Sequence, residues 1–255
     1  MQSTTLAVMS ALGDLEPLDV IITADTQNER AATYEIRDWY IDWLTKKGLS
    51  VEIVTAGNIL EQGAKEHIHI PFWTSDGGPL QRQCTKHFKI IPIKRRLREL
   101  LGFHRSEPPH PKPGAIEQWL GISWDEWTRM SDSRVKFIRH RWPLIERKMT
   151  RNDCIEYLES HDLPIPVNSA CKICPYRQAS NWLEMGPTEK NEVIEFDEQN
   201  RHNPLAARGN STADQLYIWK GLIPISQVDF EAEAAKERKA KQLPLIICES
   251  GYCWA

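Results

Sequence analysis

The chain has 255 residues, of which 41% are hydrophobic and 26% are charged, and its formal net charge at pH 7 is -3. This composition is typical of one large or two small folded domains and argues against intrinsic disorder. The small negative charge excludes a global basic field for nucleic acid, although a local basic patch can still bind one. The sequence has no run of about 18 apolar residues and no secretion signal, so we expect a soluble cytoplasmic protein that does not enter membranes.

The first 57 residues alternate between helical and strand patterns. Residues 3–13 fit a short amphipathic helix, with Ser3 or Thr4 as its cap, and residues 18–25 form an apolar run of strand length. Residues 33–48 fit a second helix, and a second strand pattern follows it. Helices that alternate with strands predict parallel strands joined by crossovers, and therefore an α/β fold.

A short polar loop, Ala-Asp-Thr-Gln-Asn-Glu at residues 24–29, follows the first predicted strand directly. Ligands of parallel sheets bind beyond the carboxyl ends of the strands, so this loop is placed to meet one. It can offer backbone N–H groups, the carboxylate of Asp25 and the hydroxyl of Thr26. The same residues also suit an ordinary turn and helix cap, and position alone leaves both interpretations open.

Farther along, residues 150–160 fit a helix capped by Thr150, with Asp153 at the capping-box position. Ile155 and Leu158 are expected to face inward, and we interpret Cys154 beside them as a core residue. Two more helices are predicted near the C-terminus, at residues 188–201 and 230–242.

Two other stretches have both a structural and a functional interpretation. Residues 93–101 predict a helix whose basic residues form either a solvated face or a phosphate-binding patch, since Arg forks match phosphate oxygens. The tryptophans Trp119, Trp124 and Trp127 are interpreted as packing residues in preference to a platform for stacking bases.

Cys171 and Cys174 form a Cys-x-x-Cys pair on a predicted turn. One turn can aim two thiolates at a single ion, so the spacing suits a metal, but it also suits a redox dithiol or plain packing. Six cysteines in a chain of this size in a reducing compartment are expected to be thiols or metal ligands, because structural disulfides are rare there.

Five stretches, taken together and in order, resemble the phosphoadenosine phosphosulfate (PAPS) reductase family of the adenine nucleotide α-hydrolase, or ATP pyrophosphatase, group. These stretches are Gln-Ser-Thr-Thr-Leu-Ala at residues 2–7, the polar loop at 24–29, and the segments at 82–97, 139–166 and 169–175. The resemblance implies a parallel-sheet, Rossmann-like fold with a helical, cysteine-bearing C-terminal part. It also implies a nucleotide-binding domain at residues 1–165 and a cysteine-containing region at 166–255.

The resemblance further implies an adenine nucleotide, ATP or PAPS, with Mg²⁺ as a companion ion. The implied nucleotide contacts are Ser3, Thr4, Asp25, Thr26, Asn28, Arg134 and Arg141, and Asp25 is also an implied catalytic residue. A helix N-terminus suits phosphate, which fits the start of the first predicted helix. The family's first strand and loop glycines do not precede Gln2. We therefore expect either that Met1 lies downstream of the natural start or that the phosphate loop is truncated.

For the cysteines, the resemblance implies a 4Fe–4S cluster, with zinc as the alternative. Its implied ligands are Cys84, Cys171, Cys174 and, from the tail, Cys248. Cys253 is the implied catalytic cysteine, although the tail lacks the Glu-Cys-Gly-x-His motif of the reductases.

Three functions follow as hypotheses. The first is a sulfur-transfer enzyme of the ATP pyrophosphatase type, whose partner is a nucleic acid substrate or a sulfur-donor protein. The second is a phosphoadenylyl- or adenylyl-sulfate reductase, and the third is a non-catalytic, zinc-stabilised accessory protein.

Overall fold

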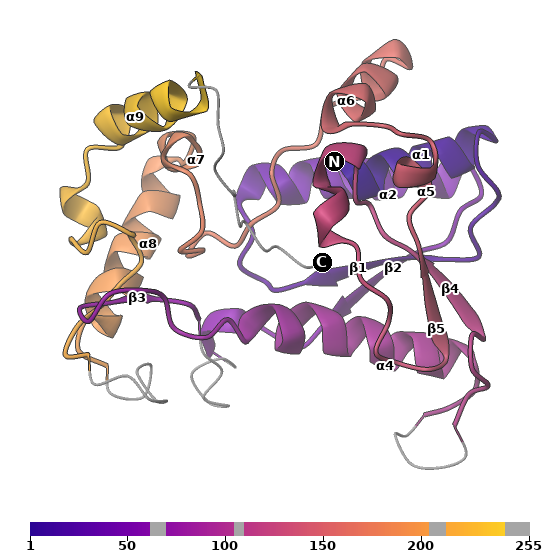
Figure 1. Ribbon diagram of the computed structural model, residues 1–255, viewed down its shortest axis with the longest axis horizontal. Helices are drawn as coiled ribbons and strands as arrows, with labels where there is room; N and C mark the ends of the chain where they lie inside the picture. The colour runs from indigo at the N-terminus through magenta and orange to yellow at the C-terminus, as the bar shows by residue number, and fades with distance from the viewer. Residues whose placement is uncertain (62–69, 105–109, 204–212, 243–255) are drawn as a thin grey trace. The chain divides into compact units, whose positions relative to one another are not determined.

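The computed structural model describes residues 1–61, 70–104, 110–203 and 213–242 and has a mixed α/β fold (Figure 1). In these ranges, no helix combines the length and apolar character needed to cross a bilayer. The chain forms two compact units. Unit 1 comprises Met1–Ala24, Ala31–Val54 and Ile91–Ser169, and unit 2 comprises Asp25–Arg30, Thr55–Ile90 and Ala170–Ala255. The expected division at residue 165 stays a prediction. Two segments that precede it in sequence, Asp25–Arg30 and Thr55–Ile90, belong to the same compact unit as the C-terminal part.

The helix and strand order expected for the start of the chain is confirmed. It consists of α1 (Gln2–Leu12), β1 (Ile21–Asp25), α2 (Ala31–Lys46) and β2 (Val51–Thr55). Helix α1 ends where Gly13 adopts a φ of 87°, which glycine tolerates because it has no Cβ. In unit 1, α1 packs along α2 (Figure 1), and Val8, Tyr40 and Leu44 are buried between them.

The described strands form three separate two-stranded sheets, β1–β2, β4–β5 and β3–β6. In unit 1, β4 (Ile116–Trp119) and β5 (Ile138–Arg141) pair in parallel, with Ile116 opposite Ile138. The rest of the unit is largely helical, with α4 (Ile91–Leu100), a 3₁₀ turn (Trp124–Arg129), α5 (Pro143–Glu146) and α6 (Arg151–Ser160).

Helix α6 begins with the predicted capping box. The backbone N–H of Asp153 donates to the Thr150 hydroxyl (3.2 Å), and the N–H of Thr150 donates to the Asp153 carboxylate (2.7 Å). The inward positions of Leu158 and Cys154 are confirmed, because both are fully buried, whereas Ile155 is only half-buried. Cys154 packs with apolar residues of α1 and α5, so its assignment to the core is confirmed.

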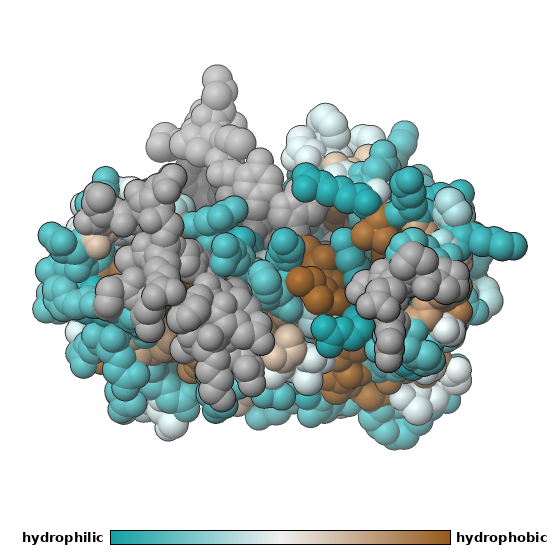
Figure 2. Space-filling view, turned by 90° about the horizontal axis from the view of Figure 1, so that it is seen from below, coloured by the Kyte–Doolittle hydropathy of each residue, from teal (hydrophilic) through white to brown (hydrophobic). Residues whose placement is uncertain are grey.

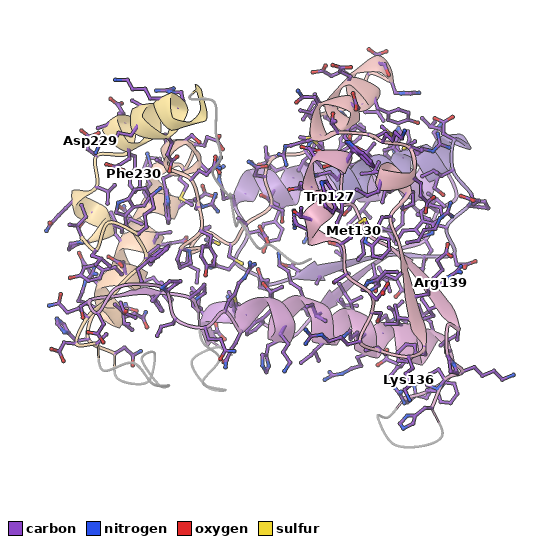
Figure 3. All side chains as sticks on the ribbon, in the orientation of Figure 1. Trp127, Met130, Lys136, Arg139, Asp229 and Phe230 are labelled. Carbon is purple, nitrogen blue, oxygen red and sulfur yellow. The ribbon has the colours of Figure 1, made fainter. Side chains whose placement is uncertain are left out.

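Unit 2 is built around a separate apolar core. Its elements are β3 (Trp73–Thr74), antiparallel to β6 (Leu216–Tyr217), a π-helical turn (Lys86–Ile90), α7 (Ala179–Leu183), α8 (Pro187–Asn200), a 3₁₀ turn (Ile225–Gln227) and α9 (Phe230–Gln242). The last two predicted helices are thus confirmed. Phe230, at the start of α9 (Figure 3), stacks on Trp182 of α7 and meets Trp219 edge-on.

Asp197 of α8 joins three segments of unit 2 and is only 1% exposed. Its carboxylate accepts hydrogen bonds from the backbone N–H groups of Ile218 and Ile225, both at 3.0 Å, and pairs with Arg201. The two N–H groups satisfy the carboxylate oxygens and Arg201 supplies the counter-charge, so this buried charge is compensated.

The exposure of two tryptophans differs from the expectation. Trp124 and Trp127 were interpreted as packing residues, but they are 44% and 59% exposed. Figure 3 labels Trp127 of the 3₁₀ turn and Met130, which directly follows that turn. Among the coloured residues on the face drawn in Figure 2, hydrophilic ones predominate, and apolar ones appear in groups between them. Single exposed apolar side chains of this kind are ordinary.

Candidate cysteine site

The polar loop at residues 24–29 forms a tight turn, which its own side chains hold in place. The Asp25 carboxylate accepts the N–H of Gln27 (2.7 Å), and Gln27 adopts a left-handed φ of 55°. The carbonyl of Thr26 accepts the N–H of Ile59 (3.0 Å), which fixes the loop to the following segment of unit 2. This Asx-type turn leaves Gln27 exposed and buries the side chains of Thr26 and Asn28.

The loop contacts the cysteine turn directly. The hydroxyl of Thr26 lies 3.1 Å from the sulfur of Cys171, which is 145 residues away in sequence. The backbone carbonyl of Asn28 accepts the N–H of Lys172 (2.7 Å). Asn28 is only 5% exposed, and within the described part of the chain its side-chain Oδ1 has no hydrogen-bond partner. A buried acceptor without a partner is uncommon and is placed to accept a ligand's donor.

The cysteine turn is rigidly anchored in unit 2. The N–H of Cys174 donates to the carbonyl of Cys171 (3.0 Å), and the N–H of Arg177 donates to that of Cys174 (3.1 Å). Ile173, between the two cysteines, is 2% exposed and belongs to the main core of the unit. The predicted turn is therefore confirmed, and burial of Ile173 leaves Cys171 and Cys174 half-buried on either side.

Cys84 lies in the same small cluster as Cys171, where both pack against Ile59 and Phe88. Phe88 belongs to the π-helical turn Lys86–Ile90. We attribute the widened turn to Pro92, which has no N–H to give to the carbonyl of Phe88 four residues earlier. Three of the four predicted ligands, Cys84, Cys171 and Cys174, thus belong to one unit.

The tail cysteines Cys248 and Cys253 fall outside the described residues. Within those residues, no group of three or more His, Cys, Asp or Glu side chains is arranged to hold a metal ion. Among the described residues, no cysteine forms a disulfide bond.

Buried charges surround the Cys171 sulfur. Burial, followed by the negative charge of Glu29, raises the pKa of the Cys171 thiol to about 12, while Lys89 and the Thr26 hydroxyl act in the opposite direction. Glu29 is 7% exposed, and its carboxylate lies 3.6 Å from the ammonium nitrogen of Lys89. At neutral pH Cys171 is therefore protonated and a poor nucleophile, and metal ligation requires it to lose that proton.

Arg177, which the sequence interpretation missed, lies against the same turn. Its Nη2 donates to the backbone carbonyls of Ala170 (2.7 Å) and Cys171 (2.8 Å), and its guanidinium lies over the ring of Trp182. Arg177 is 6% exposed, and burial lowers its pKa from the usual value. The only sequence signal was an arginine three residues after Cys174; Glu29 and Lys89 gave none.

The remaining predicted nucleotide contacts lie in unit 1. Ser3 is exposed and Thr4 half-buried in the first turn of α1, and the N-cap is Met1, so the expected capping by Ser3 or Thr4 is wrong. The backbone at Gly121 covers this turn so closely that a Cβ there would lie 2.4 Å from the Ser3 nitrogen. Binding of phosphate by Ser3 and Thr4 stays a prediction.

The two predicted phosphate-binding arginines differ in their surroundings. Arg134 is exposed, whereas Arg141 is half-buried and lies over the ring of Trp119. Arg141 forms ion pairs with three carboxylates, those of Glu16 (3.2 Å), Glu117 (3.5 Å) and Glu146 (3.0 Å). A phosphate at Arg141 would have to compete with these carboxylates, while Arg139 on β5 (Figure 3) pairs with Glu117.

No protein-family model, no curated protein and no solved structure matches this chain. The structure brings Thr26 and Asn28 into contact with the cysteine turn, and it gathers Cys84, Cys171 and Cys174 in unit 2. A functional interpretation therefore depends on this geometry and on the chemistry of the residues themselves.

Proposed function

We propose that this protein is an adenine-nucleotide-dependent sulfur-transfer enzyme of the PAPS reductase family and the ATP pyrophosphatase type, with a cysteine-ligated iron–sulfur cluster. One observation carries the proposal: the Thr26 hydroxyl touches the Cys171 sulfur at 3.1 Å. A polar loop that follows a strand and a Cys-x-x-Cys turn have separate chemical uses. Their direct contact suggests that a nucleotide and a sulfur centre act together.

The donor set fits a cluster better than it fits a single ion. Cys84, Cys171 and Cys174 offer soft thiolates, the kind of ligand that iron–sulfur clusters use, and we assign the fourth position to Cys248 of the tail. A four-iron cluster is larger than one ion, so its ligands need not converge as closely as those of zinc. When bound, the cluster supplies a site that holds or activates sulfur.

The polar loop is assigned to the nucleotide. The buried Oδ1 of Asn28 can accept an N–H of a nucleobase, and Asp25 fixes the loop through the N–H of Gln27. Ser3, Thr4, Arg134 and Arg141 are assigned to the phosphates, and Mg²⁺ accompanies them. This assignment includes a Rossmann-like arrangement in which β1 and β2 are neighbouring strands of the nucleotide-binding sheet.

The proposed reaction has two balanced steps. A substrate oxygen attacks the α-phosphorus of ATP, which releases pyrophosphate and leaves the oxygen adenylated. A sulfur nucleophile then attacks the activated carbon, and AMP departs with that oxygen. Cys253 is assigned to deliver the sulfur as the outer atom of a persulfide. A thiol of the sulfur-donor protein then breaks the S–S bond, forms a disulfide with Cys253 and leaves the sulfur on the acceptor, which is a nucleobase or another nucleic acid group.

Anaerobic purification of the full chain tests the proposal. We expect about four irons and four sulfides per chain, a number that follows from a single 4Fe–4S centre, and release of pyrophosphate from ATP when an acceptor and a sulfur donor are present. Reduction of adenylylsulfate without ATP turnover would favour the reductase. Zinc without iron, with no turnover of either nucleotide, would favour the accessory protein and contradict the proposal.

A further inference from the structure

Arg177 differs from the other buried charges of unit 2. Arg30 pairs with Glu184 at 2.7 Å, Lys89 lies beside Glu29, and Asp197 pairs with Arg201. Among the described residues, Arg177 forms no ion pair with a carboxylate, although it is 6% exposed. A buried cation without a counter-charge destabilises the folded state, even when carbonyl oxygens accept its hydrogen bonds. A counter-charge at this position would remove that cost.

The guanidinium is fixed at the cysteine turn by three contacts. Its Nη2 donates to the carbonyls of Ala170 and Cys171, and its Cζ lies 5.6 Å from the centre of the Trp182 ring. Its Nε has no hydrogen-bond partner in the described part of the chain. The cation therefore holds the backbone at Cys171 and retains an unused donor.

The groups whose charge acts on Arg177 indicate its counter-charge. Cys174 is the foremost of those that would stabilise the cation, followed by Glu29 and Cys171, while Arg30 opposes them. Glu29 already lies beside Lys89. The hydrogen bonds to the carbonyls of Ala170 and Cys171 place the guanidinium at the turn that carries both thiols. Among the described residues, Cys171 and Cys174 are therefore the candidates for a counter-charge, because thiols lose their protons when they bind a metal.

We propose that Arg177 is a positioning residue that fixes the Cys171–Cys174 turn and supplies the positive charge that stabilises both thiolates when they bind a metal centre. This inference rests on the metal centre in the proposed function, but it holds for zinc as well as for an iron–sulfur cluster. A fixed positive charge beside a cluster also favours its reduced, more negative form, because net charge and hydrogen bonding set the reduction potential.

Two substitutions separate charge from geometry. Arg177→Met removes both, and Arg177→Lys keeps the charge but lacks the planar guanidinium that lies over the Trp182 ring. In a Co²⁺ titration of the metal-free full chain at fixed pH, followed by the thiolate-to-metal absorption, we expect Arg177→Met to weaken affinity about 10- to 100-fold, the range for outer-shell partners. Arg177→Lys should lose clearly less Co²⁺ affinity than Arg177→Met. Arg177→Met should also lower the reduction potential of the protein that carries a cluster.

The matched control is Arg201→Met, which removes another largely buried guanidinium of unit 2, one that pairs with Asp197. Its Co²⁺ affinity, measured on folded protein, should equal that of the unaltered chain. Equal Co²⁺ affinity and equal potential in Arg177→Met would overturn the inference and leave the proposed function standing. Weakened Co²⁺ binding in a chain that purifies with zinc would support the inference and contradict the iron–sulfur centre. No Co²⁺ binding by the unaltered chain would overturn both.

Discussion

Cys154 in unit 1 is fully buried and Cys171 in unit 2 is half-buried, and their neighbours have opposite character. Cys154 lies among Leu6, Met9 and Leu144, and burial raises its pKa. Cys171 touches the Thr26 hydroxyl, and the charges of Glu29 and Lys89 act on it. The first environment is an ordinary core. The second places several polar groups where water cannot reach them.

The difference between these sites shows how a functional cysteine can be separated from a packing one. An apolar core gains free energy from every buried carbon, so a cysteine there needs no further explanation. Buried charges gain only when they are well paired, so a cluster of them around a thiol lowers stability unless it serves a ligand. Four substitutions test this difference, and they follow in order of expected effect.

The largest effect is expected from Cys171→Ser compared with Cys154→Ser. Loss of the Cys171 thiolate should reduce bound iron or Co²⁺ by more than about 10-fold, because a direct ligand contributes at least as much as an outer-shell partner. Cys154→Ser should leave loading of the folded protein unchanged and lower the free energy of unfolding by about 1–3 kcal/mol, because it buries a hydroxyl. Metal analysis and urea unfolding measure the two quantities. Equal loading in both variants would contradict the contrast.

Asp197→Ala should have the largest effect on stability. It leaves the N–H groups of Ile218 and Ile225 without their acceptor and Arg201 without its partner, so we expect a loss of about 3–5 kcal/mol in urea unfolding. The control Asp229→Ala, which removes the acceptor of the Ala232 N–H, should cost about 1 kcal/mol. Metal loading per folded chain should not change. A loss of loading would show that the buried charges of unit 2 do not separate into structural and functional groups.

Thr26→Val tests the contact between the polar loop and the cysteine turn. Valine keeps the shape and removes the hydroxyl, so Co²⁺ affinity should fall by about 3- to 10-fold, equivalent to one hydrogen bond of about 1 kcal/mol. The matched control is Thr33→Val in unit 1. The buried Thr33 hydroxyl has no partner among the described residues, so its loss should leave Co²⁺ affinity unchanged and not lower stability. Equal Co²⁺ affinities of Thr26→Val, Thr33→Val and the unaltered chain would show that this contact does not contribute to metal binding.

The smallest effect is a pH dependence in unit 1. The Thr150 N–H lowers the pKa of Asp153 below its ordinary value of 3.8. The charged form is therefore favoured in the folded state, so its contribution is fully present above pH 3.8 and is lost as the pH falls below that value. In urea unfolding, the stability advantage over Asp153→Asn should shrink between pH 6 and pH 3. An advantage that does not change with pH would show that the capping charge adds nothing.

Local patterns predicted well those features that depend on neighbours in sequence. The capping box at Thr150, the stop at Gly13 and the turn at Cys171 each depend on residues within four positions. Prediction failed where packing between distant segments decides the outcome. Exposure of Trp124 and Trp127 depends on what covers them, and the partial exposure of Ile155 depends on how α6 packs in unit 1.

The candidate site divides in the same way. Cysteine spacing and a polar loop after a strand are visible in the sequence because local chemistry fixes them. The charges of Arg177, Glu29 and Lys89 gave no such signal, because residues from three separate stretches meet only after folding.

The sequence by itself determined the order of the helices and strands, the turn that carries two thiols and the packing of Cys154. Only the tertiary structure decided that residues 25–30 and 170–177 are in contact and that a guanidinium without a carboxylate partner in the described chain lies beside the thiols. The reason is that the two kinds of feature depend on contacts over different distances along the chain. Helix caps and turns are set within a few residues, whereas burial of charge depends on every segment that excludes water from it.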